Sequence, residues 1–377
     1  MGKILSSVAC NLDTAMLAAC LPLLEEEKVE AMEWSFDALY QLSEIPAWFD
    51  ELLQAFSKEG RLIGHGVFFS LFSGKWSQGQ TAWLHYLKKT CNKYAFDHVT
   101  EHFGFMTGRD FHHGAPLNIP YTPTVLAIGI DRLKRIADTC QCPVGLENLA
   151  FSYSLDDVKH HGDFLQQLID PINGFIILDL HNVYCQSHNF SIAFNDLIDL
   201  YPLEKVREIH ISGGSWDGSV SAPGGKIRRD THDEPVPEEV FTALPSTLSK
   251  CMNLKFVVME QLGNGLHTES SRKMFYNDFI RMNEMVQLEN KKRVPGNSNL
   301  FIPKFPLLYD AIIEDEILQL QQDELSVIFE SSVSVSDAIH VLQNSSLAHT
   351  DWHIENWRPY MIETAFKIAQ KWKKKPV

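Results

Sequence analysis

Several features are missing from this sequence of 377 residues, and each absence excludes a class of protein. A basic excess is missing, because 33 Lys and Arg stand against 48 Asp and Glu, a formal charge of −15. Binding to nucleic acid needs a basic surface, so we expect no nucleic-acid partner. No uninterrupted run of about 18 apolar residues occurs, so we expect no membrane span. No GxGxxG turn follows the first apolar run, which argues against a dinucleotide-binding fold.

A disulfide framework is missing too. The seven cysteines are odd in number and scattered, and the CxC at 140–142 has no second pair at zinc-site spacing. We interpret them as reduced thiols. The stretch Leu17-Ala-Ala-Cys20 is similar to a lipoprotein cleavage site, but Asn11 and Asp13 interrupt the apolar run that an export signal needs. We therefore expect a cytoplasmic protein.

What the sequence does contain is a regular alternation of short apolar runs and longer amphipathic segments over residues 1–288. The expected strands are Ser6–Cys10, Glu30–Trp34, Leu62–Gly66, Tyr94–His102, Pro143–Asn148, Gly174–Asp179, Arg207–Ser212 and Lys255–Glu260. The expected helices are Thr14–Glu27, Ala47–Lys58, Gln80–Asn92, Thr124–Thr139, Asp156–Leu168, Asn195–Leu200, Pro237–Met252 and Thr268–Val286. Eight such units in fewer than 290 residues predict an α/β fold, a (β/α)8 TIM barrel.

The alternation ends after Val286. Residues 289–299 are charged and then rich in Pro, Gly and Asn, which is typical of a linker. Residues 300–377 have helical periodicity and form an expected helical C-terminal extension, with helices at Leu307–Gln321, Val335–Gln343 and Arg358–Lys374. We expect this extension either to bind peptide or a partner, or to pack as a helical cap on the barrel.

Ionisable side chains stand at the ends of six of the eight expected strands. They are His65, His102, Glu147, Asp179, His210 and Glu260. The carboxyl ends of all strands form one mouth in a barrel, so these groups should converge there. Asp230 and His232 lie in the loop after the seventh strand, above the same mouth. Their i, i+2 spacing in extended chain would aim both side chains the same way.

Each of these residues has an ordinary structural interpretation when it is considered alone. A histidine at a strand end is more often hydrogen-bonded than a ligand, and an Asp or Glu there is usually a helix N-cap. So many such ends in one barrel are hard to obtain from independent caps. Clustered buried carboxylates are very unfavourable unless a cation neutralises them. The pattern therefore predicts a metal cluster.

The ligand types narrow the choice of metal. Imidazole and carboxylate groups without cysteine suit Fe, Mn or Zn. Eight ligands are too many for one ion, so we expect two or three ions about 3.5–4 Å apart, bridged by carboxylates. Glu147 and Asp179, on neighbouring strands, are the expected bridging residues.

Several motifs resemble, in the expected order, those of the multinuclear non-haem iron-dependent oxidases, long called domain of unknown function 692. They are GHGVFFSLFSG (64–74), EHFGF (101–105), LENLAFSYS (146–154), ILDLHNVYCQSHN (177–189), REIHISGG (207–214), DTHDEPVP (230–237) and VVMEQ (257–261). The resemblance covers roughly residues 1–285. The ligand order is also similar to that of the trinuclear-zinc apurinic endonucleases of the xylose-isomerase-like barrels. Those endonucleases have a histidine at the position of Asn182. The Asn of this chain is instead similar to that of many of the oxidases.

The resemblance to the oxidases implies metal-ligand roles for His65, His102, Glu147, Asp179, Asn182, His210, Asp230, His232 and Glu260. Asp230, His232 and His210 are also the expected catalytic residues. His181 and His188 are expected to replace a ligand or to contact substrate. Nothing in the resemblance extends to residues 300–377.

The function that the resemblance implies is oxidation of a ribosomally synthesised precursor peptide, at Cys or at a C-terminal residue. It implies two or three irons of mixed Fe(II)/Fe(III) valence, O2 as co-substrate and a separate partner protein that binds the peptide leader. Two alternatives stay open at this point. One is a zinc phosphodiesterase or endonuclease with a metal-activated water, and the other is a metal-binding barrel that only scaffolds a complex.

Overall fold

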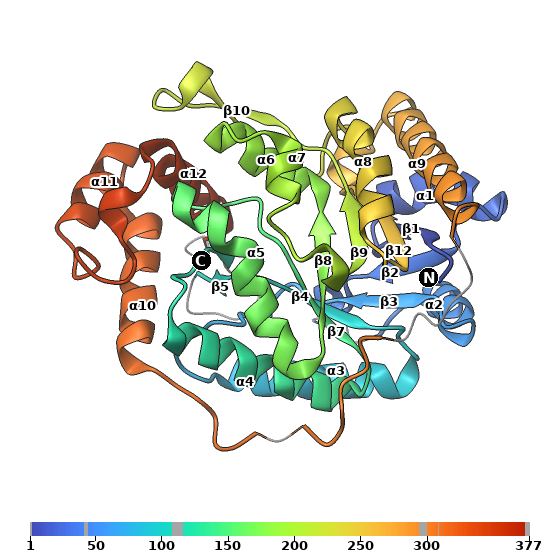
Figure 1. The fold of residues 1–377 in the computed structure, drawn as a ribbon, viewed down its shortest axis with the longest axis horizontal. Coiled ribbons are helices and arrows are strands. Elements are labelled where there is room, and N and C mark those ends of the chain that lie inside the picture. Colours follow the sequence, from blue (N-terminus) through green and yellow to red (C-terminus); the bar gives the residue numbers. More distant parts are fainter. Residues whose placement is uncertain (1, 41–43, 108–115, 294–299, 308, 374–377) are drawn as a thin grey trace.

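The computed structural model describes residues 2–40, 44–107, 116–293, 300–307 and 309–373, and it contains a closed barrel of parallel strands (Figure 1). Around the barrel the strands follow the order β1-β12-β9-β8-β7-β4-β3-β2. Their bounds are β1 Leu5–Ala9, β2 Ala31–Trp34, β3 Leu62–His65, β4 Val99–His102, β7 Val144–Glu147, β8 Phe175–Asp179, β9 Val206–Ile211 and β12 Phe256–Met259. The expected (β/α)8 barrel is therefore confirmed.

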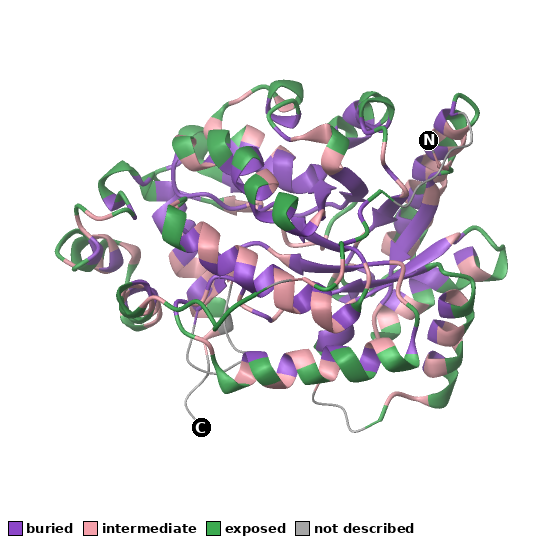
Figure 2. Ribbon diagram, turned by 60° about the horizontal axis from the view of Figure 1, so that its bottom comes forward, coloured by how far each residue is buried: buried purple, intermediate pink, exposed green. Residues whose placement is uncertain are grey.

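Helices surround the barrel and bury one face each against it, as Figure 2 shows by the purple inner and green outer sides of the ribbons. The barrel helices are α1 Thr14–Glu25, α2 Ala47–Lys58, α3 Gln78–Lys93, α4 Pro123–Cys140, α5 Leu155–Ile169, α6 Leu180–Phe190, α7 Phe194–Ile198, α8 Glu238–Lys250 and α9 Glu269–Asn290. Side-chain N-caps fix several of their starts, and Ser77 and Ser154 form capping boxes on α3 and α5. In the described part of the chain, no helix has the length and apolarity to cross a bilayer.

Two short antiparallel strand pairs lie in the loops that follow the barrel strands. The sequence analysis did not predict them. They pair β5 Phe105–Met106 with β6 Pro116–Leu117, and β10 Trp216–Gly218 with β11 Lys226–Arg228. The expected strand Tyr94–His102 was too long, because Tyr94 caps the end of α3 by donating its N–H to Thr90 O at 2.9 Å. The strand itself begins at Val99.

The C-terminal extension packs along one side of the barrel, with its helices at the left of Figure 1. They are α10 Glu316–Ser331, α11 Val335–Gln343 and α12 Pro359–Trp372. The expected helix Leu307–Gln321 was placed too early, because Asp315 is the N-cap of α10. Of the expected linker 289–299, residues 294–299 lie outside the described residues, as does Lys374 at the end of the last expected helix.

The extension contacts loops that follow several barrel strands. Gln322 on α10 accepts a hydrogen bond from Gly74 N at 2.9 Å, in the loop after β3. Tyr360 on α12 donates to Asn189 O at 2.9 Å, at the end of α6. Trp357 stacks on Tyr153 after β7, with ring centroids 3.6 Å apart. These contacts place the extension beside the mouth of the barrel.

Candidate metal centre

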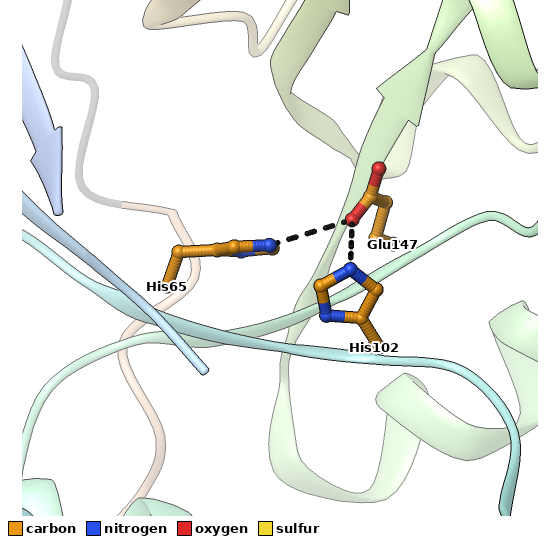
Figure 3. A group of neighbouring side chains, drawn as sticks. All are labelled: His65, His102 and Glu147. Atoms are coloured by element: carbon orange, nitrogen blue, oxygen red, sulfur yellow. Dashed lines mark ion pairs between the residues drawn. The ribbon is translucent and has the colours of Figure 1, made fainter. Parts of the chain in front are cut away.

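Two histidines on neighbouring strands point at the same oxygen of Glu147, as Figure 3 shows. His65 Nε2 lies 3.6 Å and His102 Nε2 lies 3.4 Å from Glu147 Oε2. Both distances exceed those of ordinary hydrogen bonds. His102 Nδ1 lies 3.0 Å from the carbonyl oxygen of Gly66, so Nδ1 must donate and Nε2 keeps its lone pair. The three atoms therefore surround a small space as potential ligands.

His65 has its tautomer fixed in a similar way. Thr100 Oγ1 donates to Gly64 O at 3.3 Å, so it accepts from His65 Nδ1 at 2.8 Å. The Nε2 of His65 is then left as a lone pair that faces Glu147. Partners that fix the ring of a histidine from behind are usual around metal-binding histidines.

The next group lies around His210, which is fully buried at the end of β9. Its Nδ1 is 3.2 Å from Glu260 Oε2 and 3.8 Å from Glu147 Oε1. Glu147, Asp179, His210 and Glu260 bring one potential ligand atom each within 4.8 Å of one another. Asp179 uses Oδ1 to accept from Asn182 N at 2.7 Å, which caps α6, and its other oxygen stays available to the mouth.

A third group comes from the loop after β9. His232 Nε2 lies 3.0 Å from Asp230 Oδ2, and His232 Nδ1 lies 3.7 Å from Glu260 Oε2. The expected extended chain is not present, because His232 has a left-handed backbone with φ 52°. The two side chains nevertheless lie together. Asn182 donates to Asn148 O at 2.8 Å, which orients its amide group.

A test of metal fit comes from buried polar atoms without hydrogen-bond partners. Among the described residues, six of the nine expected ligands carry one: His65 Nε2, Glu147 Oε2, Asp179 Oδ2, Asn182 Oδ1, His210 Nδ1 and His232 Nδ1. A buried polar atom without a partner costs free energy, about 1–3 kcal/mol for a typical group. Each of the six can offer a lone pair to a metal once any proton on it is displaced, so bound cations would satisfy them together. The residues present fit a metal cluster.

The electrostatics of the carboxylates agree with this fit. Burial raises the pKa of Glu147 to about 8, and Glu260 and Asp230 nearby add to the shift while His210 opposes it. Burial and the charges of Asp230 and Glu147 likewise raise the pKa of Asp179 well above its usual range. Cations at this place would restore the ionised forms that bind metal.

His210 shows the opposite shift. Burial disfavours its charged form, but Glu33, Glu208 and Glu260 outweigh burial and raise the pKa of His210 well above its usual value. A cation bound at Nδ1 would therefore have to displace a proton. The ring is oriented from its other side, where Nε2 donates to Glu208 Oε1 at 2.8 Å.

Sequence reasoning missed this layer beneath the ligands. Glu33 on β2 is 1% exposed, and its Oε2 lies 3.2 Å from His210 Nε2. Glu208 on β9 also contacts His98 Nε2 through Oε2, at 2.5 Å. The sequence does contain a sign of this layer, because Glu33 in AMEW and Glu208 in REIH are charged residues inside expected strands. Glu208 contacts two histidines, so this layer can orient the ligands, and Glu33, Glu208 and His210 also bring one potential ligand atom each within 4.8 Å of one another.

The buried chain continues to the other end of the barrel. His98 Nδ1 lies 3.0 Å from Asp97 Oδ1. Asp97 in turn accepts from Arg207 Nη2 at 2.6 Å and forms an ion pair with Lys255. His98, Arg207 and Lys255 hold the pKa of Asp97 well below its usual range although burial opposes the shift. Ion pairs thus connect the end of the barrel at which the strands begin to His210, near the end of β9.

His181 and His188, which were expected to replace a ligand or to contact substrate, both lie on α6. His181 is fully buried; its Nδ1 donates to Asp230 Oδ1 at 3.0 Å and its Nε2 accepts from Arg228 Nε at 3.2 Å. Both ring nitrogens are thus engaged, and the residue orients Asp230. His188 lies on the last turn of α6, exposed, with its ring 4.3 Å from that of Trp216.

The ligand side chains differ in exposure. The side chains of His65, Asp179 and His210 are at most 2% exposed. Those of His102 and Asp230 are 27% and 20% exposed. Among the expected ligands, His102 and Asp230 thus meet solvent most.

A family model described as "RiPP precursor modification enzyme MbnB/TglH/ChrH" matches residues 27–264. The chain belongs to this family. The match includes all nine expected ligands and stops before the extension, and it confirms the family that the sequence motifs indicated. The matched part thus covers the barrel from β2 to β12, without β1, α1 and α9.

Relatives named UPF0276 proteins are similar over part of the chain. One from Caulobacter vibrioides is 26% identical over 38% of this chain and 49% of its own. One from Acaryochloris marina is 27% identical over 49% of this chain and 64% of its own. The chain thus spans about half to two thirds of the length of these relatives.

Among solved structures, an L-ribulose 3-epimerase is similar with a TM-score of 0.47 and 13% identity, over 78% of this chain and 97% of its own. Endonuclease IV from Thermus thermophilus is similar with a TM-score of 0.46 and 12% identity, over 74% of this chain and 99% of its own.

Proposed function

We propose that this protein is an O2-dependent oxidase with two or three irons that modifies a ribosomally synthesised peptide at a Cys or C-terminal residue. The observation that carries the proposal is the convergence of unpartnered nitrogen and oxygen atoms on one buried mouth. Membership of a family described as precursor-modifying enzymes supports the peptide as substrate. A separate leader-binding protein is part of the same proposal.

Three groups of residues would hold the irons. His65, His102 and Glu147 form the first, and Glu147, Asp179, His210 and Glu260 form the second. Asp230 and His232 form the third beside Glu260, and Asn182 lies next to Glu147. Nitrogen and oxygen ligands without cysteine suit Fe, and also Mn or Zn as alternatives. Bound iron would supply O2 activation and one-electron oxidation of the substrate.

The protein's own residues would orient ligands and admit the substrate from one side. Asp230 and His232, expected to be catalytic with His210, lie where the centre opens to solvent. His181 fixes the carboxylate of Asp230, so its position does not depend on the incoming peptide. The fully buried His210 side of the centre excludes water, which would keep reactive species from solvent.

Metal analysis by plasma mass spectrometry tests the proposal. The protein is purified without oxygen from iron-supplemented cells, together with His65→Ala, Asp230→Ala and the exposed control His188→Ala. We expect about two or three irons per chain in the wild type and in the control, and fewer in the other two variants. O2 uptake in the presence of the precursor peptide then tests the oxidase.

The remaining outcomes separate the alternatives. Zinc at full occupancy under these conditions, with cleavage of abasic DNA, would favour the hydrolase. Metal-binding protein that consumes no O2 with its peptide would contradict the oxidase. No bound metal would mean that the converging residues are structural.

A further inference from the structure

A cavity of about 320 Å³ lies between the barrel and the C-terminal extension. The barrel contributes residues 118–122, which lead into α4, and residues around the start of α5. The extension contributes the segment 351–357. The volume suits a long amino-acid side chain, and none of the lining residues belongs to the candidate metal centre.

Aromatic rings line the cavity. Tyr153 stacks on Trp357 with an interplanar angle of 5°, and Tyr121 stacks on Phe164 with centroids 4.4 Å apart. Tyr153 is 3% exposed, and its hydroxyl has no hydrogen-bond partner in the described part of the chain. A buried hydroxyl normally has a partner, so a ligand that accepts or donates here would complete the cavity.

The charged side chains that line the cavity are acidic. Asp156 and Asp351 line it and are exposed, and no Lys or Arg is among the described residues that line it. Asp157 also lines it, but its carboxylate is used to cap α5. The nearby part of the extension has the same sign, since residues 305–357 contain ten Asp or Glu and no Lys or Arg, and Arg358 follows them. Carboxylates next to aromatic rings attract cationic side chains through charge and cation–π contacts.

The cavity is close enough to the centre to share one peptide with it. Tyr153 follows the expected ligand Glu147 by six residues. A fully extended chain spans at most about 3.6 Å per residue, so the two Cα atoms are within about 22 Å of each other. A peptide segment of about seven residues therefore reaches from one to the other.

We propose that this cavity binds a lysine or arginine side chain of the peptide substrate, within about seven residues of the residue that reacts. The proposal rests on the proposed function for the existence of a peptide substrate. It assigns the extension the role of completing a substrate-binding site beside the mouth.

Fluorescence polarisation on the full-length protein at low salt tests the site. The probe is a fluorescein-labelled Ala-Lys-Ala-Lys-Ala peptide, and its counterpart has Glu in place of Lys. The double variant D156N/D351N removes the two charges of the cavity. The matched control D310N/D323N removes two exposed charges of the extension outside the cavity.

We expect the lysine probe to bind the wild type and the glutamate probe not to bind. Each exposed ion pair changes affinity by about 1.4- to 5-fold, so D156N/D351N should raise Kd about 2- to 25-fold. The control should change Kd less than about twofold. Equal weakening in both double variants would overturn the site, because it would show diffuse attraction to an acidic surface. Absence of lysine-probe binding, or equal binding of both probes, would also overturn it.

The result is independent of the metal chemistry. The binding assay needs no iron and no turnover, and the metal content of D156N/D351N should equal that of the wild type. Failure of the oxidase proposal would leave the binding result standing, and failure of binding would leave the metal analysis standing.

Discussion

Acid should weaken this fold through one buried histidine outside the metal centre. His161 on α5 is 4% exposed, and burial lowers its pKa to about 3. The neutral ring accepts from Leu149 N at 3.1 Å, two residues beyond the expected ligand Glu147. Phe103 packs edge-on against it, with centroids 4.6 Å apart. A proton on His161 would remove the acceptor and place a charge among aromatic rings.

The direction of the effect follows from the lowered pKa. Unfolded chain binds the proton near pH 6.5, whereas the folded protein resists it down to about pH 3. The unfolded state therefore gains protons as the pH falls below 6.5, and the free energy of unfolding decreases. Between pH 7.5 and pH 5.0 the contribution of His161 amounts to about 2 kcal/mol, from 1.36 kcal/mol per pH unit.

Urea denaturation at the two pH values measures this contribution. The variant His161→Gln keeps an acceptor for Leu149 N but cannot titrate, so between pH 7.5 and pH 5.0 it should lose about 2 kcal/mol less than the wild type. His160→Gln, on the exposed side of the same helix, controls for the loss of one imidazole and should follow the wild type. Identical pH dependence in His161→Gln and the wild type would refute the reasoning.

Three further predictions concern stability. Gly213→Ala should lower it by about 1–3 kcal/mol, because a Cβ would lie 2.1 and 2.4 Å from two carbonyl oxygens of the Asp230 loop. Gly218→Ala, with nothing within 4 Å, should change it by less than about 0.5 kcal/mol in the same thermal scan. Tyr360→Phe removes the bond to Asn189 O and should cost about 1 kcal/mol in urea; no change would mean that the extension is held without it. His98→Leu leaves a buried glutamate with one partner fewer and should cost about 3–5 kcal/mol, and a near-neutral result would contradict the ion pair.

The barrel could be predicted because its signals are local. Parallel strands buried on both faces produce continuous apolar runs, and each run here is followed by a helical segment. The ligand positions at the strand ends follow from the topology alone. This rule selected six of the nine expected ligands, whereas Asp230 and His232 come from a loop and Asn182 from the resemblance.

Other features depend on three-dimensional information. No helix was expected over Leu180–Phe190, but Asp179 is the N-cap of α6 there, so one residue both faces the mouth and starts a helix. His181 then points down from α6 to Asp230, which the spacing along the chain could not show. Glu33 and Glu208 lie within strands, and only the register of the barrel shows that they face its axis and not the helices.

The prediction of a helix at the start of the extension was wrong for a different reason. The apolar residues of 307–315 have helical spacing, but the described residues 309–315 are not helical and are held by side chains of α4. Arg132 donates to Ile313 O at 2.8 Å and Arg135 to Asp310 O at 3.1 Å. Tertiary hydrogen bonds thus replace the local ones that a helix would need.

The buried chain from Lys255 and Asp97 through His98 and Glu208 to His210 has a consequence for protein engineering. In most (β/α)8 barrels the face that binds ligands and the face that stabilises the fold can be varied separately. Here the polar contacts run along the axis and join residues before β4 to residues of β9, across the boundary between the two halves of the barrel. A chimera that exchanges half-barrels, or a graft of the mouth residues alone onto another barrel, would cut this chain. A successful transplant would have to carry the axial polar residues of both halves together with the ligands.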